Sequence, residues 1–340
     1  MLNGFVLDTL IVAGFLLTGA VWSAIVDAFD GASGDDGGSD FVGGPDDDTF
    51  IGTDAADVMD GGGGNDILDG LGGDDLLLGG TGLDEIFGRD GNDIISGGQN
   101  NDLLYGGGGQ DSLSGGRGDD ALYGGAGRDL LVGNGGDDVL NGVGGSDRLF
   151  GSTGDDVLLG GAGGDHLFGG AGNDVLRGQM GDDELFGGAG ERDELYGGNG
   201  NDVLYGGAAN AGLVANNRLD GGVGDDTLIL RGADRAIGGD GSDGFHLLAT
   251  SSEPSVTPGS GGAVYATIGD YDPAHDTITI DYDPADYAGV PSVSVSIVGS
   301  TANIFLNLQW IAEVANAPGL TAGDIAVAPD YDAGRGLTSV

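Results

Sequence analysis

GGGGQDSLS, GGRGDDALY and GGAGRDLLV are three consecutive nonapeptides that fill residues 106–132 and carry the pattern that decides the fold. Each begins with two glycines, has aspartate at its sixth position and has leucine at its eighth. An aspartate recurs every nine residues from Asp48 to Asp183, and after a one-residue insertion the series resumes at Asp193 and Asp202. A fixed period of this kind predicts a repeat architecture.

Two further features stay in register with the aspartate through all 18 copies. Glycine stands five residues before it, and an apolar residue, usually leucine, stands two residues after it. A flexible acidic spacer would not keep an apolar residue in register so often. The copies break at about residue 208 and recover as GGVGDDTLI at 221–229 and GGDGSDGFH at 238–246. Because terminal repeats are atypical, Phe245 is expected to close the end of the stack.

The local chemistry of the nonapeptide favours strands over helices. Nine residues are too few for a helix and its return, and each glycine would destabilise a helix by about 1 kcal/mol. The residues that follow each aspartate fit a short strand whose middle side chain points inward. Glycine tolerates the backbone angles of the turns between such strands. We therefore predict an all-β fold in which two strands and two turns form an 18-residue coil, and successive coils stack in parallel.

Such a roll has little apolar surface for its length. One apolar side chain in nine residues must offset the entropy of ordering all nine. Stacking also aligns the aspartates in columns at the inter-strand spacing of about 4.8 Å, where like charges repel. Ca²⁺ between the turns would remove this repulsion, because it accepts about six to eight oxygen ligands, including backbone carbonyls, whereas Mg²⁺ demands octahedral geometry and keeps its waters. We expect multiple Ca²⁺ ions as cofactors, and a roll that is marginal or unfolded without them.

The composition agrees with cation binding and argues against other functions. The 340 residues include 56 acidic residues and 10 basic residues, all of them Arg, for a formal charge of −46. Phosphate would be repelled, so we expect no nucleic-acid partner. The chain has no Cys, which excludes disulfides and thiolate metal sites. No H-E-x-x-H, G-x-S-x-G or EF-hand motif occurs, and we predict that the protein is not an enzyme.

The copies resemble the GGxGxDxUx nonapeptide of RTX (repeats-in-toxin) proteins, a hemolysin-type calcium-binding repeat family, over roughly residues 43–246. The resemblance implies a right-handed parallel β-roll that binds Ca²⁺ between turns one coil apart. It also implies that the sixth-position aspartate supplies carboxylate oxygens and that early glycines supply backbone carbonyls. The clearest copies are residues 106–114, 124–132, 160–168, 169–177 and 187–196.

The candidate metal ligands follow from that resemblance. Copies between residues 133 and 153 have Asn134, Val143 and Ser152 in place of the second glycine, and we expect them to bind more weakly. We predict no catalytic residue. The predicted ligands are Asp48, Asp57, Asp66, Asp75, Asp84, Asp93, Asp102, Asp111, Asp120, Asp129, Asp138, Asp147, Asp156, Asp165, Asp174, Asp183, Asp193, Asp202, Asp226 and Asp243, with Gly107, Gly109, Gly125 and Gly127.

Composition divides the chain into five segments. They are an apolar helix at 1–29, an acidic linker at 30–42, the regular repeats at 43–207, degenerate repeats and a cap at 208–248, and a small β-rich C-terminal domain at 249–340. Alternating residues predict strands in the last segment at 263–268, 277–282, 292–298 and 304–310.

The two ends bear on export. Residues 9–26 carry no charge, which just reaches the length of a membrane-spanning helix, and no Lys or Arg precedes them as in a typical signal peptide. We expect a membrane anchor or an uncleaved signal-like helix; a cleaved leader and a helix docked elsewhere on the protein are the alternatives. Residues 268–283 and 319–327 resemble the β-rich segment that follows the repeats in many RTX proteins, which implies a signal for a type I secretion apparatus.

These observations predict a secreted or surface-exposed bacterial protein that binds Ca²⁺ and folds on binding it outside the cell. The alternative is a membrane-anchored adhesin or surface-layer component, with the roll as a calcium-stiffened stalk. A hydrolase within residues 249–340 is a third hypothesis, and it would require activity that survives deletion of the repeats.

Overall fold

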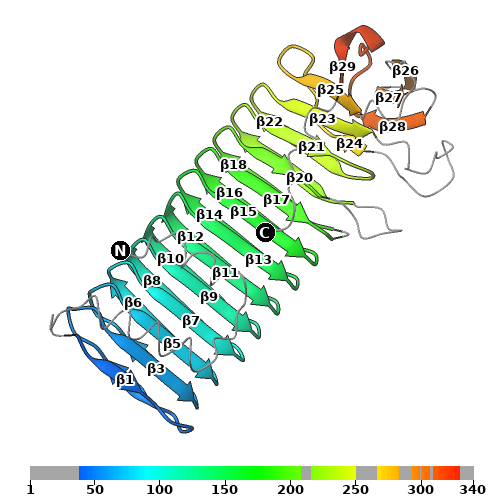
Figure 1. Cartoon of the computed structure of the whole chain (residues 1–340). Helices are drawn as coiled ribbons and strands as arrows, with labels where there is room; N and C mark the ends of the chain where they lie inside the picture. The colour runs from blue at the N-terminus through cyan, green and yellow to red at the C-terminus, as the bar shows by residue number, and fades with distance from the viewer. Residues whose placement is uncertain are drawn as a thin grey trace. The chain divides into compact units, whose positions relative to one another are not determined.

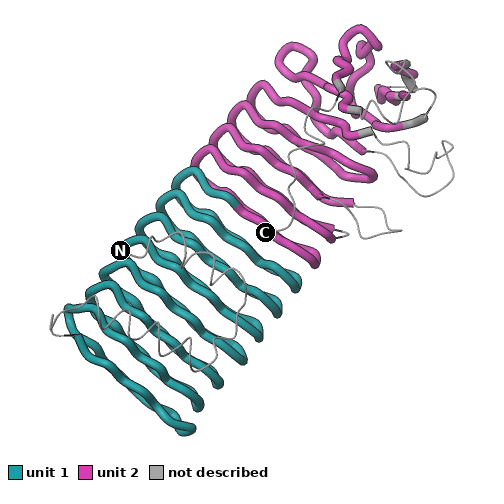
Figure 2. The backbone as a smooth tube through the Cα atoms, in the orientation of Figure 1, with its two compact units in different colours: residues 1–166 teal, residues 167–340 magenta. Residues whose placement is uncertain are grey.

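The computed structural model describes residues 38–190, 192–207, 216–249, 266–282, 293–298, 300–306 and 309–329. The chain divides into two compact units, residues 1–166 and 167–340 (Figure 2). Both are built from short β-strands, and the described residues contain no α-helix (Figure 1). In this part of the chain no helix is long and apolar enough to cross a membrane. The predicted N-terminal helix, and with it the predicted anchor at 9–26, lies outside the described residues.

In unit 1 the strands alternate between two parallel sheets, so that each strand pairs with the strand two positions along the chain. The register confirms the 18-residue coil: Leu104 pairs with Leu122, and Leu122 with Leu140. One sheet contains β1 (Asp40–Val42), β3 (Val58–Gly63), β5 (Leu76–Thr81), β7 (Ile94–Gln99), β9 (Ser112–Arg117), β11 (Leu130–Gly135) and β13 (Arg148–Thr153). The other contains β2 (Thr49–Ile51), β4 (Ile67–Asp69), β6 (Glu85–Asp90), β8 (Leu103–Gly109), β10 (Ala121–Gly127), β12 (Val139–Gly145) and β14 (Val157–Ala162).

The core follows from the two-residue period of a strand. Asp111, Leu113 and Gly115 are buried, and the residues between them are half-exposed. The sixth, eighth and following first positions of the nonapeptide therefore all point inward. The eighth-position side chains from Met59 to Leu158 are fully buried, and each contributes about 1.5–3 kcal/mol.

Unit 2 begins with the same arrangement. One sheet contains β15 (His166–Ala171), β17 (Glu184–Gly188), β19 (Val203–Tyr205), β21 (Thr227–Leu230) and β23 (Gly244–Ala249), and the other contains β16 (Val175–Met180), β18 (Glu194–Asn199), β20 (Arg218–Val223) and β22 (Arg235–Asp240). The insertion noted in the sequence lengthens one turn, so that Leu176 pairs with Leu195, 19 residues on.

The C-terminal strands, β24 (Ala266–Ile268), β25 (Thr277–Tyr282), β26 (Val293–Val298), β27 (Thr301–Leu306), β28 (Gln309–Val314) and β29 (Ile325–Pro329), also belong to unit 2. Phe245 of β23 pairs with Ile278, and Ile278 pairs with Ile325. The expectation that Phe245 closes the stack is therefore wrong, because two further strands follow it.

The strand predicted at 277–282 is confirmed by β25. The stretch predicted as one strand at 304–310 instead runs from β27 into β28, and these two strands pair antiparallel. Apolar residues alternate through the whole of 304–310 in the sequence, so the pattern alone did not mark where the first strand ends.

Candidate metal centre

The predicted ligand aspartates lie where each turn enters a strand. Nineteen of the twenty are at most 3% exposed, and Asp48 at the start of the series is half-buried. They face inward because they stand two residues before the buried apolar side chain. A carboxylate buried to this extent requires hydrogen bonds or a cation.

One oxygen of each carboxylate links successive coils. Oδ1 of Asp120 accepts a hydrogen bond from the backbone N–H of Asp102 at 2.8 Å, and Oδ1 of Asp138 accepts one from Asp120 at 2.8 Å. The contact recurs along both edges of the repeats in each unit, at 2.8–3.1 Å. We call each row of linked aspartates an aspartate column.

The second oxygen faces inward without a donor. In twelve column members Oδ2 is buried and accepts no hydrogen bond: Asp66, Asp75, Asp84, Asp93, Asp102, Asp111, Asp120, Asp129, Asp138, Asp147, Asp202 and Asp226. A buried oxygen without a donor destabilises the fold, because nothing replaces its lost hydration unless a cation is present.

A backbone carbonyl lies beside this oxygen, in a space that only glycine leaves open. A Cβ built on Gly106 would lie less than 3.0 Å from Oδ2 of Asp111 and from the carbonyl oxygen of Gly124. A Cβ on Gly142 would meet Oδ2 of Asp147 and the carbonyl oxygen of Gly160 equally closely. We call this space the glycine cradle. A carboxylate oxygen from one coil and a carbonyl oxygen from the next converge there, which is the hard-oxygen environment that Ca²⁺ prefers.

Burial also raises the pKa of many of the column carboxyls. The pKa reaches about 8 in Asp75, Asp102 and Asp138, and about 7 in Asp111 and Asp120. Desolvation is the main cause, and the backbone hydrogen bond from the preceding coil lowers the pKa in part. Neighbouring column aspartates raise it further. A cation would reverse this preference, because it favours the charged carboxylate.

Side chains alone would not complete a metal site. Within the described residues, no group of three or more His, Asp or Glu side chains could hold a metal ion together. A cation at these turns would need backbone carbonyl oxygens in addition to the carboxylates. The carbonyl oxygens of Gly107 and Gly109 would lie less than 3.0 Å from a Cβ on Gly125 and Gly127 of the next coil, so they face the space between coils.

The three departures from the glycine pattern between residues 133 and 153 keep the same backbone. Asn134, Val143 and Ser152 have φ values of 77°, 76° and 84°, in the left-handed region that glycine occupies in most other copies. The carbonyls of these turns therefore keep their place. The weaker binding expected for these copies stays a prediction.

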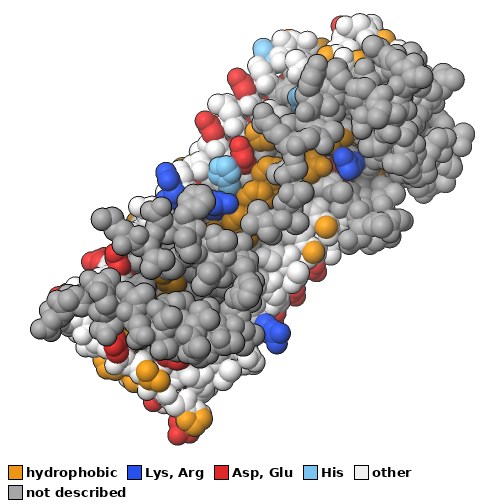
Figure 3. Space-filling view, in the orientation of Figure 1, with side chains coloured by type: hydrophobic (Ala, Val, Ile, Leu, Met, Phe, Trp, Pro, Cys, Tyr) orange, Lys and Arg blue, Asp and Glu red, His pale blue; other side chains and the backbone are white. Residues whose placement is uncertain are grey.

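Sequence reasoning missed a second, exposed ladder formed by the fifth-position residues. Oδ1 of Asn101 accepts a hydrogen bond from the N–H of Asp119 at 2.9 Å, and Oδ1 of Asp119 accepts one from Asp137 at 2.9 Å. The side chains of this outer ladder point along the stack in the opposite direction to those of the columns. Acidic side chains are visible along the edges of the face shown in Figure 3. The signal was present in the sequence, because Asp or Asn often precedes the column aspartate.

Two further members of the aspartate columns lie beyond residue 207, where the nonapeptide pattern is interrupted. Asn217 and Asp234 are 1% and 0% exposed, and they continue the column after Asp193. The N–H of Asp193 donates to Oδ1 of Asn217 at 2.8 Å, and the N–H of Asn217 donates to Oδ1 of Asp234 at 2.9 Å. Leu219 and Ala236 fill the core two residues later. An Asx-x-apolar search without the glycine requirement would have found both.

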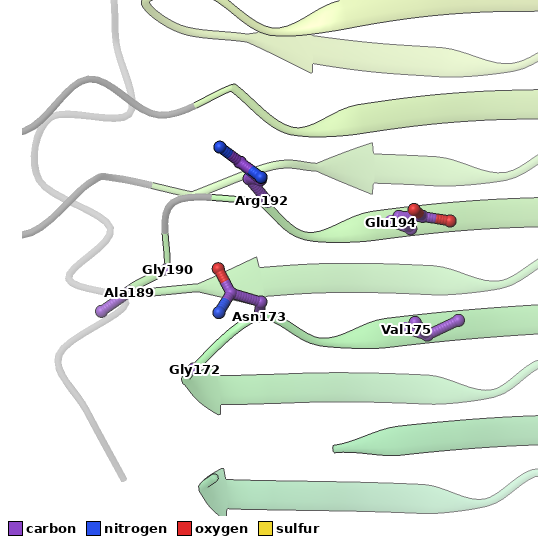
Figure 4. Close-up of a pocket in the computed structure, with 7 residues that line it drawn as sticks. All are labelled: Gly172, Asn173, Val175, Ala189, Gly190, Arg192 and Glu194. Carbon is purple, nitrogen blue, oxygen red and sulfur yellow. The ribbon is translucent and has the colours of Figure 1, made fainter. Parts of the chain in front are cut away.

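A hollow of about 650 Å³ in unit 2 is a different kind of site. It lies next to the one-residue insertion and is lined by Gly172, Asn173, Val175, Ala189, Gly190, Arg192 and Glu194 (Figure 4). The guanidinium of Arg192 makes it unsuitable for a cation. Two of the described histidines, His246 and His275, each contact an aspartate, at 2.8 and 3.0 Å.

Comparison with known proteins agrees with this geometry. Residues 42–210 match the family model of the RTX calcium-binding nonapeptide repeat, in nine overlapping segments. No curated protein sequence matches the chain. Among solved structures, the chain is similar to a hyperactive, Ca²⁺-dependent, β-helical antifreeze protein from an Antarctic bacterium, with 17% identity, 70% of this chain and 86% of that chain covered, and a TM-score of 0.43.

It is also similar to the AlgE6R3 subunit of the Azotobacter vinelandii mannuronan C5-epimerase, with 27% identity, 48% of this chain and 78% of that chain covered, and a TM-score of 0.19. The family predicted from the nonapeptides is confirmed by the family model. Over residues 42–210, the chain belongs to the RTX calcium-binding nonapeptide repeat family.

Proposed function

We propose that this protein binds calcium through its repeats and folds when Ca²⁺ enters the glycine cradles. The observation that carries the proposal is the buried Oδ2 atom without a donor, repeated in twelve turns beside a converging carbonyl. A cation that binds only the folded chain stabilises it by about 2.7 kcal/mol per site when free Ca²⁺ is roughly 100-fold above Kd. Over many sites this term decides whether the repeats fold.

The proposed ligands are the column aspartates and backbone carbonyls. The aspartates are those predicted from the sequence, from Asp48 to Asp243. The carbonyls are those of the first-position glycines, such as Gly124, and of the early glycines Gly107, Gly109, Gly125 and Gly127. The outer ladder is not part of the proposed site, because its side chains are exposed to water and so carry no buried oxygen that a cation would need to compensate.

We further propose that the chain is exported by a type I apparatus and folds outside the cell. Cytosolic Ca²⁺ is scarce, so the acidic repeats would stay extended there and could be threaded through the apparatus. Millimolar Ca²⁺ outside would then fold them. The proposed role of the repeats is structural rather than catalytic, which the family supports.

Circular dichroism of the purified chain, titrated with Ca²⁺ and separately with Mg²⁺, tests the proposal. We expect a cooperative gain of β signal with Ca²⁺ alone. Replacing Asp120, Asp129 and Asp138 together with Asn should raise the midpoint Ca²⁺ concentration, because each change removes a charged ligand oxygen.

A matched control separates ligand loss from loss of charge. Replacing Asp74, Asp119 and Asp137 with Asn removes the same three charges from the outer ladder, where the Asn oxygen can still accept the backbone hydrogen bond. We expect a much smaller shift of the midpoint. Equal shifts in the two triple variants would contradict the assignment of the column aspartates as ligands.

A further inference from the structure

The cradle at Gly206 in unit 2 is surrounded by different polar atoms from those of the regular cradles. At the Gly206 cradle, a built Cβ would meet Nδ2 of Asn217 at 2.9 Å and Oδ2 of Asp234 at 3.0 Å. The regular Gly221 cradle in the same unit has Oδ2 of Asp226 and the carbonyl oxygen of Gly238 in these places. The Gly206 cradle therefore contains a hydrogen-bond donor where the regular cradle contains only acceptors.

The orientation of the Asn217 amide is determined by its partners. Its Oδ1 accepts from the backbone N–H of Asp193 at 2.8 Å, and its Nδ2 donates to the carbonyl oxygen of Gly206 at 2.8 Å. A flipped amide would place two donors together and two acceptors together. The amide is 1% exposed, so both hydrogen bonds are shielded from water.

The next member of this column is also satisfied. Oδ1 of Asp234 accepts from the N–H of Asn217 at 2.9 Å, and its Oδ2 accepts from the N–H of Arg231 at 2.9 Å. By contrast, Oδ2 of Asp226 on the other edge has no donor. Each acceptor that would face a cation at the Gly206 cradle already has a hydrogen bond.

We propose that the Gly206 cradle is closed without calcium, and that the side-chain amide of Asn217 occupies the place that a cation takes in the regular cradles. This inference rests on the proposed function and refines it. On the edge of unit 2 that contains Asn217, the row of ions is interrupted at this level. The opposite edge continues through Asp226 with the regular acceptor set.

Calcium counting on the full-length chain tests the proposal, by equilibrium dialysis or native mass spectrometry at saturating Ca²⁺. The variants are Asn217→Ala and the matched control Asp226→Ala. We expect Asn217→Ala to bind as many ions as the wild type, and Asp226→Ala to bind at least one fewer. Asn217→Ser, which keeps a single donor, provides the same comparison if the Ala variant does not fold.

Melting temperature against Ca²⁺ concentration gives a second measure. If Asn217→Ala and the wild type bind equal numbers of ions, Tm differs by a constant amount at every saturating concentration. For Asp226→Ala the gap should widen as Ca²⁺ rises, because the wild type gains an additional ion. Loss of an ion, or a widening gap, for Asn217→Ala overturns the inference alone. A wild-type chain that binds no Ca²⁺ overturns the proposed function and this inference together.

Discussion

The repeats of unit 1 and the C-terminal strands β25 and β29 of unit 2 both pair in parallel, but their turns bind carboxylates differently. In the repeats, each carboxylate has one oxygen bonded to a backbone N–H and, in most turns, a second oxygen without a donor. Near the C-terminus, Asp270 accepts from Gly238 and Gly239 at 2.9 Å through both its oxygens. Asp276 likewise accepts from Asp243 and Asp272.

Their cores differ as well. Most strands of unit 1 bury one large apolar side chain, such as Leu113, whereas β23, the last strand with the repeat pattern, buries Phe245 and Leu247, and β25 buries Ile278 and Ile280. The C-terminal strands therefore gain more free energy from apolar burial. Their carboxylates also accept hydrogen bonds through both oxygens, so less desolvation is left uncompensated. The comparison indicates that dependence on a cation is set turn by turn, by whether the second carboxylate oxygen has a donor.

Removal of calcium should expose this difference most strongly. In chelator, we expect backbone amides between residues 57 and 202 to lose their protection against hydrogen exchange, while those of β23, β25 and β29 retain more of it. The reason is that only the repeats would be left with rows of buried, mutually repelling carboxylates. Hydrogen exchange with mass spectrometry, with and without chelator, measures both regions in one sample. Undiminished protection of the repeats in chelator would contradict the proposed function itself.

Acid should act on the two regions in opposite directions. The folded-state pKa of Asp75, Asp102 and Asp138 is raised to about 8 by desolvation, above the usual 3.8. Their contribution to folding is therefore present below about pH 4 and is lost as the pH rises towards 8. In metal-depleted buffer, lowering the pH from 8 to about 5 should increase the β signal of the repeats.

In the C-terminal turns, the pH dependence of stability has the opposite sign. The N–H of Ala274 lowers the pKa of Asp272, and hydrogen bonds from Thr321 lower that of Asp324. Their contribution is present at neutral pH and is lost as the pH falls below 3.8. Exchange measured from pH 8 to below pH 3.8 should show the repeats gaining protection between pH 8 and about 5, and the C-terminal turns losing it only below pH 3.8. A loss of β signal from the repeats between pH 8 and 5 would contradict the role assigned to the column carboxyls.

Much of the fold could be predicted because the nonapeptide and the strand share a simple period. Asp111, Leu113 and Gly115 point inward for the same reason, so a single copy describes the turn, the core and the ligand column together. The family, the parallel strands and the calcium chemistry all followed from that register. The right-handed coiling of the roll, which the resemblance implies, stays a prediction.

The features that could not be predicted lie where the nine-residue period ends. Asn217 and Asp234 continue a column through long-range hydrogen bonds, although the glycines that would mark their copies are missing. Phe245 occupies a regular inward position, and only the pairing of β23 with β25 shows that it is not terminal. These contacts join segments whose separation in sequence follows no repeat, so no local pattern encodes them.

The smallest effect we predict comes from one methyl group in a cradle. Gly124→Ala would place a Cβ 2.6 Å from Oδ2 of Asp129 and 3.0 Å from the carbonyl oxygen of Gly142, where the cation is proposed to bind. The carboxylate cannot move aside freely, because Oδ1 of Asp129 accepts from the N–H of Asp111 at 2.9 Å. We expect a loss of about 1–3 kcal/mol in unfolding free energy at saturating Ca²⁺, and a higher Ca²⁺ midpoint.

Two alanine variants make this result specific to the cradle. Gly144→Ala, in the neighbouring β12, would meet one backbone oxygen at 4.0 Å, and Gly269→Ala, among the C-terminal strands, would meet its nearest atoms at 3.5 Å. None of the three glycines has a positive φ that would strain alanine. Both controls should therefore be neutral, or more stable by up to about 1 kcal/mol through the lower entropy of the unfolded chain. If Gly124→Ala shifted the Ca²⁺ midpoint no more than Gly144→Ala did, the cation would have to bind away from the cradle, and the contrast between the two regions would need another cause.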